Sequence, residues 1–337
     1  MAREKVGIRD VAKLAGVSPA TVSRVLNRPE LVAERLRDQV HRAMARLGYA
    51  PNALARGLRT RHTGVLGLIV PDIAHPFFAE VVRGVEDVAS REGYRVFLCN
   101  TDENPDKEEK YVAELLNHRV EGIIFISSSN SRAQLTSSSD VPVVVVDRRV
   151  SLDDLHEVLC DDVLGGRLAT EHLLSLEHRH LAFLGGPQVI PNNADRLRGC
   201  REALAQAQLA LDQALVAEVL VRVEAGERAT EQLLDTGRYF SALFAANDLL
   251  AIGAVRALRA RGLEVPGDVS VVGYDDVWFA AHLSPPLTTV AQPKRELGER
   301  AMQRLLALVR GQAPPERLVR MLPALVVRQS TAPPRHK

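Results

Sequence analysis

The stretch IRDVAKLAGVSPATVSRVLN, residues 8 to 27, carries two helical patterns separated by a turn. Apolar residues recur at helical spacing over 8–15, and Gly16 stands where a left-handed helix end is expected. Ser18 and Pro19 then supply an N-cap and a first-turn proline with a preset φ. The stretch therefore predicts one short helix over 8–15 and a second that begins at Pro19.

A third amphipathic helix is expected from about Val32 to Leu47, with Gly48 at its end. The apolar residues that can form a core are Val22, Val25 and Leu26 in the second helix and Leu36, Val40, Ala43, Met44 and Leu47 in the third. Two short helices joined by a tight turn and followed by a bracing helix are typical of a helix-turn-helix. A helical hairpin in an enzyme would look similar, but position, charge and capping favour the DNA-binding interpretation.

The segment that contains these helices is strongly basic. Residues 1–61 hold 13 Lys and Arg against 5 Asp and Glu, a net charge of +8, and the remainder has a net charge of −7. A compact basic segment of this size indicates a polyanionic partner. A solvated basic tail would lack the periodic apolar positions found here.

The whole chain of 337 residues is long enough for two or three domains. Apolar residues make up 46% of it and aromatic residues 4%, which favours an α/β protein packed by Val, Leu and Ala. Cys99, Cys160 and Cys200 are far apart, which is typical of free thiols in a reducing cytoplasm. The start has no signal-peptide pattern, and no run approaches the ~18 apolar residues of a membrane span, so we expect a cytoplasmic protein.

Beyond Thr63 apolar strand-like runs alternate with amphipathic helices. The runs are GVLGLIV, YRVFLCN, EGIIFIS, PVVVVD, EVLCD, HLAFLGG, ALVAEVLV, SALFAA, VSVVGYD and LTTVAQ. This alternation predicts parallel sheets covered by helices on both faces, and the number of runs is enough for two sheets. Ligands of such sheets bind beyond the carboxyl ends of the strands, where this chain places polar residues. These are Asp147, Arg148, Asn247, Asp248, Asp275 and Gln292.

The segment PNALARGLRT, residues 51–60, predicts a helix that is unstable on its own. Isolated helices shorter than ~12 residues are marginal in water, and Gly57 weakens this one by about 1 kcal/mol relative to alanine. The segment is therefore suited to fold only when a partner holds it. A flexible basic linker is the alternative interpretation.

Taken together, these motifs resemble those of the LacI/GalR family of transcription repressors. The resemblance covers essentially the whole chain, through IRDVAKLAGVSPATVSRVLN, LGYAPNALARGLRT, HPFFAEVVRGVED, VVVVDRR, AANDLLAIGAVRAL, VPGDVSVVGYDD and LTTVAQP in the family's order. It implies an all-α helix-turn-helix head and an α/β core of two doubly wound parallel-sheet lobes, similar to periplasmic binding proteins. The implied bounds are 1–50 for the head, 51–61 for a hinge helix, 62–161 with 293–322 for one lobe, and 162–292 with 323–337 for the other.

The resemblance also implies how the chain meets DNA. The second helix would lie in the major groove, with Pro19, Ala20 and Arg24 at base edges. Two hinge helices of a homodimer would pack in the minor groove of a palindromic operator, with Leu58 wedged into the central base step. The complete implied set is Ser18, Pro19, Ala20, Thr21, Ser23, Arg24, Asn27, Tyr49, Asn52, Ala55, Arg56, Leu58 and Arg59.

A small effector, expected to be a sugar, would bind between the two lobes. The residues implied for this site are His75, Phe77, Phe78, Asp147, Arg148, Arg196, Asn247, Asp275 and Gln292. Carboxylates, amides and arginine suit hydroxyl groups, and aromatic faces cover the C–H surface of a sugar. Singly, each residue has an ordinary alternative, such as a core position for Phe77 or a helix cap at Asp248. His75 departs from relatives that bind pentoses, which commonly have Asn there.

Two other function classes fit less well. A sugar-binding transport component needs a secretion signal and no basic helical head. An enzyme would need a site that these motifs do not provide, because the chain has no glycine-rich phosphate loop, no GxSxG and no metal-ligand spacing. We therefore expect a ligand-controlled DNA-binding regulator without cofactor or metal.

Overall fold

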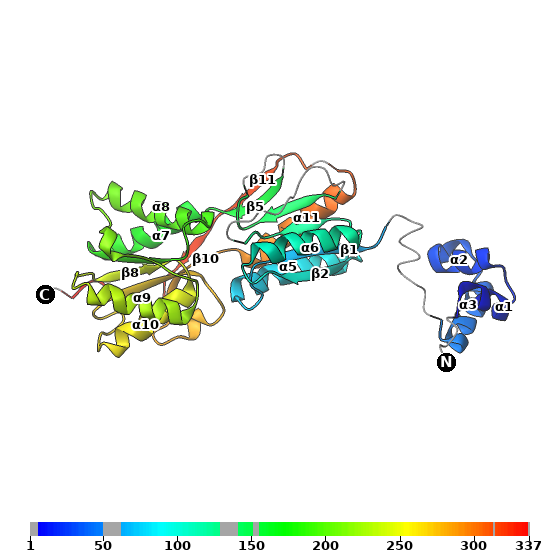
Figure 1. The fold of residues 1–337 in the computed structure, drawn as a ribbon, viewed down its shortest axis with the longest axis horizontal. Helices are drawn as coiled ribbons and strands as arrows, with labels where there is room; N and C mark the ends of the chain where they lie inside the picture. Colours follow the sequence, from blue (N-terminus) through cyan, green and yellow to red (C-terminus); the bar gives the residue numbers. More distant parts are fainter. Residues whose placement is uncertain (1–5, 50–61, 129–140, 151–154, 313, 336–337) are drawn as a thin grey trace. The chain divides into compact units, whose positions relative to one another are not determined.

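The structure, a computed structural model, describes residues 6–49, 62–128, 141–150, 155–312 and 314–335. The chain divides into two compact units, residues 1–63 and residues 64–337. The first unit is helical, and the second contains two six-stranded sheets (Figure 1). In the part of the chain that the structure describes, no helix is long and apolar enough to span a membrane.

The helical head contains α1 (Ile8–Ala15), α2 (Pro19–Asn27) and α3 (Glu34–Leu47), with a short 3-10 turn at Pro29–Leu31. Gly16 and Gly48 end α1 and α3 in the left-handed region, with φ of 64° and 62°. The buried side chains between the helices are Val11, Ala12, Val22, Val25, Val40 and Ala43. The predicted order and the first two helices are therefore confirmed.

The third helix differs from its prediction at its start. Val32 is extended, with φ −124° and ψ 133°, because the 3-10 turn before it has already reversed the chain. The helix begins two residues later, at Glu34. Leu36 is half-buried and does not belong to the core that Val40 and Ala43 share with α1 and α2.

The first sheet of the core is parallel throughout, in the order β11-β5-β4-β3-β1-β2. Its strands are β1 (Val65–Val70), β2 (Arg95–Asn100), β3 (Ile123–Phe125), β4 (Val143–Val146), β5 (His156–Cys160) and β11 (Leu318–Met321). Helices α5 (Pro76–Arg91) and α11 (Lys294–Val309) cover one face, and α6 (Pro105–Asn117) covers the other. Successive strand residues alternate between these two cores, as period-two side chains must.

The second sheet has the order β12-β10-β9-β8-β6-β7, and only its pairing of β10 with β12 is antiparallel among the described strands. Its strands are β6 (Leu181–Gly185), β7 (Val216–Glu218), β8 (Ala242–Ala245), β9 (Ser270–Asp275), β10 (Thr288–Ala291) and β12 (Ala324–Val326). Helices α7 (Asp162–Ser175) and α8 (Pro191–Gln206) pack on one face, and α9 (Val223–Asp235) and α10 (Asp248–Ala260) pack on the other (Figure 1).

The chain passes between the two sheets three times. The crossovers follow β5, β10 and β11, and they span residue 161, residues 292–293 and residues 322–323. The strand runs quoted above include neither β11 nor β12, which are short and partly exposed. Because each crossover is short, side chains beside it lie within reach of both sheets.

Candidate DNA-reading surface and ligand cavity

Helix α2 is anchored on one side and exposed on the other. Val22 and Val25 are buried against the head's core, while Pro19, Ala20 and Arg24 are exposed. The predicted base-reading residues therefore share the free side of this helix. An exposed arginine preceded by small residues can approach a base edge without obstruction.

The start of α2 is held by its cap, as predicted. The Oγ of Ser18 accepts a hydrogen bond from the backbone N–H of Thr21 at 3.1 Å and lies 2.9 Å from the Thr21 hydroxyl. Thr21 and Ser23 are half-buried, and Tyr49 packs partly against the head's core. The side chain of Asn27 and the residues Asn52, Ala55, Arg56, Leu58 and Arg59 lie outside the described residues.

In the core, a cavity of about 290 Å³ lies beyond the carboxyl ends of strands from both sheets. Eight of the nine residues predicted for the effector site line it. They are His75, Phe77, Phe78, Asp147, Arg148, Arg196, Asn247 and Asp275. The ninth, Gln292, lies beside it and donates from its amide to Asp275 Oδ1 at 2.8 Å. The structure therefore brings together groups separated by more than 200 residues.

Arg196 is held rigidly in the floor of this region. Its Nε donates to Asp162 Oδ1 at 2.7 Å, and another guanidinium nitrogen donates to the backbone oxygen of Ala246 at 2.8 Å. The guanidinium lies 3.8 Å from the ring centroid of Tyr274, whose hydroxyl donates to the same Asp162 oxygen at 3.0 Å. Burial raises the pKa of Asp162, while the adjacent Arg196 opposes that rise. The result is a preorganised cationic group that uses two of its five guanidinium N–H groups for Asp162 and Ala246.

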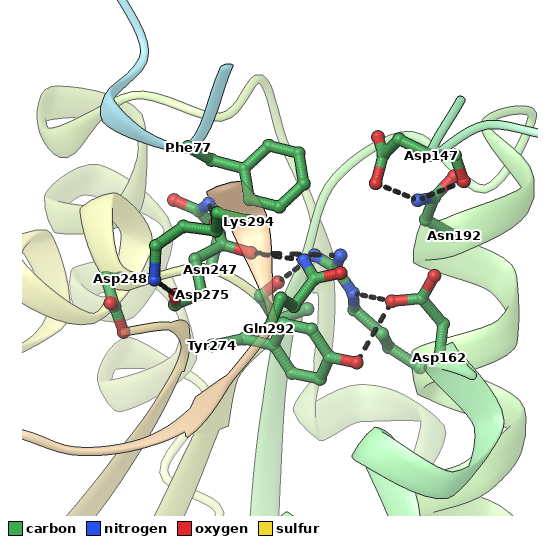
Figure 2. Close-up of polar contacts among 12 residues, drawn as sticks. Phe77, Asp147, Asp162, Asn192, Asn247, Asp248, Tyr274, Asp275, Gln292 and Lys294 are labelled. Atoms are coloured by element: carbon green, nitrogen blue, oxygen red, sulfur yellow. Dashed lines mark hydrogen bonds and ion pairs between the residues drawn. The ribbon is translucent and has the colours of Figure 1, made fainter. Parts of the chain in front are cut away.

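Asp275 stands at the centre of a second set of contacts, visible in Figure 2. Its carboxylate accepts from the Asn247 side chain as well as from Gln292, and its backbone oxygen accepts from Lys294 Nζ at 2.5 Å. The oxygen of the Asn247 amide caps α10 by accepting from the N–H of Leu249 at 2.8 Å. Asp275 has φ of 102°, a conformation that non-glycine residues adopt rarely and mostly at functional positions.

His75 serves as the N-cap of α5, where its Nδ1 accepts from the N–H of Phe77 at 3.2 Å. Its Nε2 lies 3.1 Å from the Asn247 amide nitrogen, which joins the two lobes across the cavity. Burial lowers the pKa of His75, although Asp275 and Asp72 oppose this shift. His75 therefore serves as the N-cap of α5 and also lines the cavity. Phe77 and Phe78 have both of the roles that the sequence left open. They are buried in the hydrophobic core, and they also line the cavity.

Arg148 makes its hydrogen bonds within its own lobe. Its guanidinium makes a bidentate ion pair with Glu103 at 2.8 and 2.9 Å and donates to the backbone oxygen of Ser127 at 2.9 Å. It lies 5.3 Å from the ring centroid of Phe78. The sequence patterns do not predict Glu103, because nothing near it in the chain signals a partner 45 residues away.

Asn192, which the sequence patterns do not single out, contacts Asp147 across the lobes. The Asn192 amide nitrogen donates to the backbone oxygen and to Oδ1 of Asp147, both at 3.2 Å. Asp147 is in the left-handed region, with φ of 65°, and burial raises its pKa to about 7. The local signal for Asn192 is only that of a residue in the first turn of a helix after Pro191.

Other polar residues have structural roles. Asp248 is fully buried and accepts from Thr289 Oγ1 at 2.6 Å and from the N–H of Val277 at 2.8 Å, outside the cavity. Asp161 caps α7, and His178 lies just beyond the end of that helix. The His178 ring nitrogens lie 2.8 Å from Ser241 Oγ and 3.0 Å from Ser270 Oγ, so it ties the second lobe together.

Comparison with protein families matches both units. A family model described as bacterial regulatory proteins, lacI family, matches residues 7–52. A second model, described as periplasmic binding proteins and sugar binding domain of the LacI family, matches residues 63–321. Together these matches cover most of the chain and agree with the two units seen in the structure.

Curated relatives extend this likeness over the full length. The transcriptional regulator DegA of Bacillus subtilis is 36% identical over 334 residues, covering 98% of this chain and 99% of DegA. The transcriptional repressor PurR of Aliivibrio fischeri is 35% identical over 328 residues, covering 96% of this chain and 97% of PurR.

Solved structures give the same result. A Lac repressor dimer bound to operator and the anti-inducer ONPF has a TM-score of 0.89 and 31% identity, covering 98% of this chain and all of that one. A complex of the transcriptional regulator CelR with cellobiose has a TM-score of 0.75 and 34% identity, covering 96% of this chain and 99% of that one.

Proposed function

The chain belongs to the LacI family of bacterial regulatory proteins, and from that premise we propose which residues read DNA and which hold the effector. It is a DNA-binding transcription regulator of the repressor type and not an enzyme. Its partners are operator DNA, a small effector and a second copy of the chain. The observation that carries the proposal is the cavity, because eight predicted residues from both lobes converge on it.

We propose that α2 reads the operator. Arg24 would donate to guanine O6 and N7, Ala20 would contact a thymine methyl, and Pro19 would lie at a base edge. The start of α2, Thr21 and Ser23 would contact phosphates and set the register. The exposure of Pro19, Ala20 and Arg24 beside the buried Val22 and Val25 supports this assignment.

For the domain boundaries we propose a head of residues 1–50, a hinge of 51–61, and lobes of 62–161 with 293–322 and 162–292 with 323–337. The hinge residues Asn52, Ala55, Arg56, Leu58 and Arg59 would enter or flank the minor groove. We also propose a cytoplasmic location, because a transcription regulator must reach chromosomal DNA.

The proposed effector is a sugar or sugar derivative, bound by the nine residues named for the site. It would change the relative position of the lobes, since His75 with Asn247 and Asp147 with Asn192 are contacts between them. That change would alter whether the marginal hinge helices can form on DNA. All four residues of these contacts line the cavity, so a ligand bound there would touch both connections between the lobes.

The test is a thermal-shift panel of sugars, nucleobases and phosphorylated sugars, followed by operator affinity with and without each compound that binds. Operator fragments can be selected from genomic DNA by gel shift at physiological salt. A sugar that raises the melting temperature and changes operator affinity supports the proposal. Stabilisation by purines and by no sugar would overturn the sugar assignment and favour a purine effector, as the likeness to PurR would then suggest.

A further inference from the structure

Among the described residues, one side chain that lines the cavity and one that lies beside it each have a buried oxygen without a hydrogen-bond partner. These oxygens are Asn192 Oδ1 and Gln292 Oε1, in side chains that are 6% and 4% exposed. In both residues the amide nitrogen is already used, by Asp147 and by Asp275 respectively. Both open positions are hydrogen-bond acceptors. A buried polar atom without a partner costs free energy unless a ligand or water supplies one, so these oxygens call for a ligand that donates.

The two buried arginines of the cavity do not offer a free positive charge. Arg148 is neutralised by the bidentate pair with Glu103, and Asp147 lies 3.9 Å from its Nε. Arg196 is neutralised by Asp162, with Asp275 3.9 Å from another nitrogen. In Arg148 the pair uses the guanidinium edge formed by the two terminal nitrogens, which is an edge that arginine can present to a phosphate or carboxylate.

The charged groups around the cavity also disfavour an anionic ligand. The cavity lining has five carboxyl groups, of Asp72, Asp102, Glu103, Asp147 and Asp275, and Asp147 is only partly ionised at neutral pH because burial raises its pKa to about 7. Against them stand three arginines, of which Arg222 is exposed. An anionic ligand would enter a region with more carboxyl than guanidinium groups, in which each buried arginine already forms an ion pair with a carboxylate. Burying a charge without a partner is strongly unfavourable.

We propose that the effector is a donor-rich polyol without an anionic group, and that Glu103 is the specificity residue that excludes phosphate esters by occupying Arg148. This inference rests on the proposed sugar effector and narrows it. Hydroxyl groups satisfy Asn192 and Gln292 and can donate to the cavity carboxylates. A phosphate satisfies none of these groups, because at neutral pH it is chiefly an acceptor.

The experiment titrates the full-length protein calorimetrically with matched pairs: D-ribose and ribose 5-phosphate, D-glucose and glucose 6-phosphate, cellobiose and its 6'-phosphate. For any free sugar that binds, the ester should bind at least about 100-fold more weakly, as expected for an unpaired buried charge. Inorganic phosphate alone should not bind the cavity.

The variant Glu103→Gln should gain ester binding, because it frees the Arg148 fork while keeping the size of the side chain. We expect it to bring the ester within about tenfold of the free sugar. The matched control is Asp102→Asn, which removes the neighbouring rim carboxylate but leaves the Arg148–Glu103 pair in place. This control should still exclude the ester.

The outcomes separate this inference from the function on which it rests. If the wild-type protein binds an ester as tightly as the free sugar, and both change its operator affinity, the inference about Glu103 is wrong. The proposal that a sugar controls the regulator still holds in that case. Binding of neither sugars nor esters overturns the proposed sugar effector, and the inference with it. If Glu103→Gln melts well below the wild type, the wild-type comparison of sugar and ester still decides the matter.

Discussion

At the scale of single residues, Arg24 is the sharpest probe of DNA reading, because it is exposed on the free side of α2. A bidentate arginine–guanine contact is worth about 1–3 kcal/mol of discrimination against the wrong base. We expect Arg24→Ala to relax preference mainly at one base pair in each half-site. Binding measured on a library of single-base operator variants checks this, and a uniform loss across all sequences would show that Arg24 contacts phosphate instead.

Asp147 should give the core an unusual dependence on pH. Burial raises its pKa from 3.8 to about 7, so between these values the folded protein keeps a proton that the unfolded chain releases. The free energy of unfolding therefore falls as pH rises through that range, and the loss is complete above about 7. Asp248, whose pKa burial raises to about 8, contributes in the same direction.

The variant Asp147→Asn removes the ionisation and should flatten this slope. We expect it to be more stable than the wild type at pH 8, by on the order of 3 kcal/mol, and nearly equal to it at pH 4.5, since each pKa unit is worth about 1.4 kcal/mol. Urea unfolding of the unliganded protein at several pH values measures the difference. Asp106→Asn, at an exposed position, is the control. A variant with the wild-type slope would show that Asp147 stays ionised when buried.

At the scale of elements, three helix pairs in the core pack through facing glycines. A Cβ on Gly84 in α5 would lie 2.0 Å from the backbone oxygen of Arg295, and one on Gly298 in α11 would lie 2.1 Å from that of Val81. The pairs α7 with α8 and α9 with α10 show the same arrangement. These helices approach so closely that a methyl group has no space between them.

We therefore expect Gly84→Ala to destabilise the core, although alanine favours helix by about 1 kcal/mol. Overpacking of a tight contact costs about 1–3 kcal/mol, and here the obstacle is backbone, which cannot rotate away. Ser90→Ala on the exposed side of α5 is the matched control and should be neutral or slightly stabilising. A chemical unfolding midpoint for Gly84→Ala at or above that of the wild type would contradict this packing.

The hinge, residues 51–61, is the second element with a testable role, although it lies outside the described residues. Its length and Gly57 make it marginal as an isolated helix. We expect Leu58→Gly to weaken operator binding by at least tenfold, because it removes the proposed wedge and lowers helix propensity. Gel shift measures operator binding and calorimetry measures effector binding, which should stay nearly unchanged. If the variant lost both operator binding and effector binding, Leu58 would be needed for the folding of the core and not only for DNA binding.

At the scale of the whole molecule, the two ligands must influence each other equally. If the effector changes operator affinity by some factor, operator DNA must change effector affinity by the same factor, because both describe one coupling free energy. We expect a factor of about 5 to 150, the range of ordinary allosteric coupling. Calorimetric titration of the effector with and without saturating operator measures it. Unequal factors would mean that the DNA-bound and free proteins differ in assembly as well as conformation.

Much of the fold follows from local patterns. Capping by Ser18 and Gly16 marks the first two helices because those positions depend only on residues a few places away. The start of α3 and the strands β11 and β12 are less well marked. The start of α3 depends on the 3-10 turn before it. The positions of β11 and β12 depend on their partner strands β5 and β10, which lie elsewhere in the chain. Local periodicity carries no information about such partners.

Local sequence patterns predict the helical head, the two-sheet core and four residues of the cavity, since parallel strands bring their carboxyl ends to one edge. The family resemblance adds His75, Phe77, Phe78 and Arg196 to the cavity. The pairing of these residues becomes visible only in the packed structure. Glu103 occupies Arg148 and Asn192 joins Asp147 because crossovers and loops place them together, across 45 residues in each case. Hydrogen bonding between groups so far apart depends on the packed positions of whole elements, which no local pattern encodes.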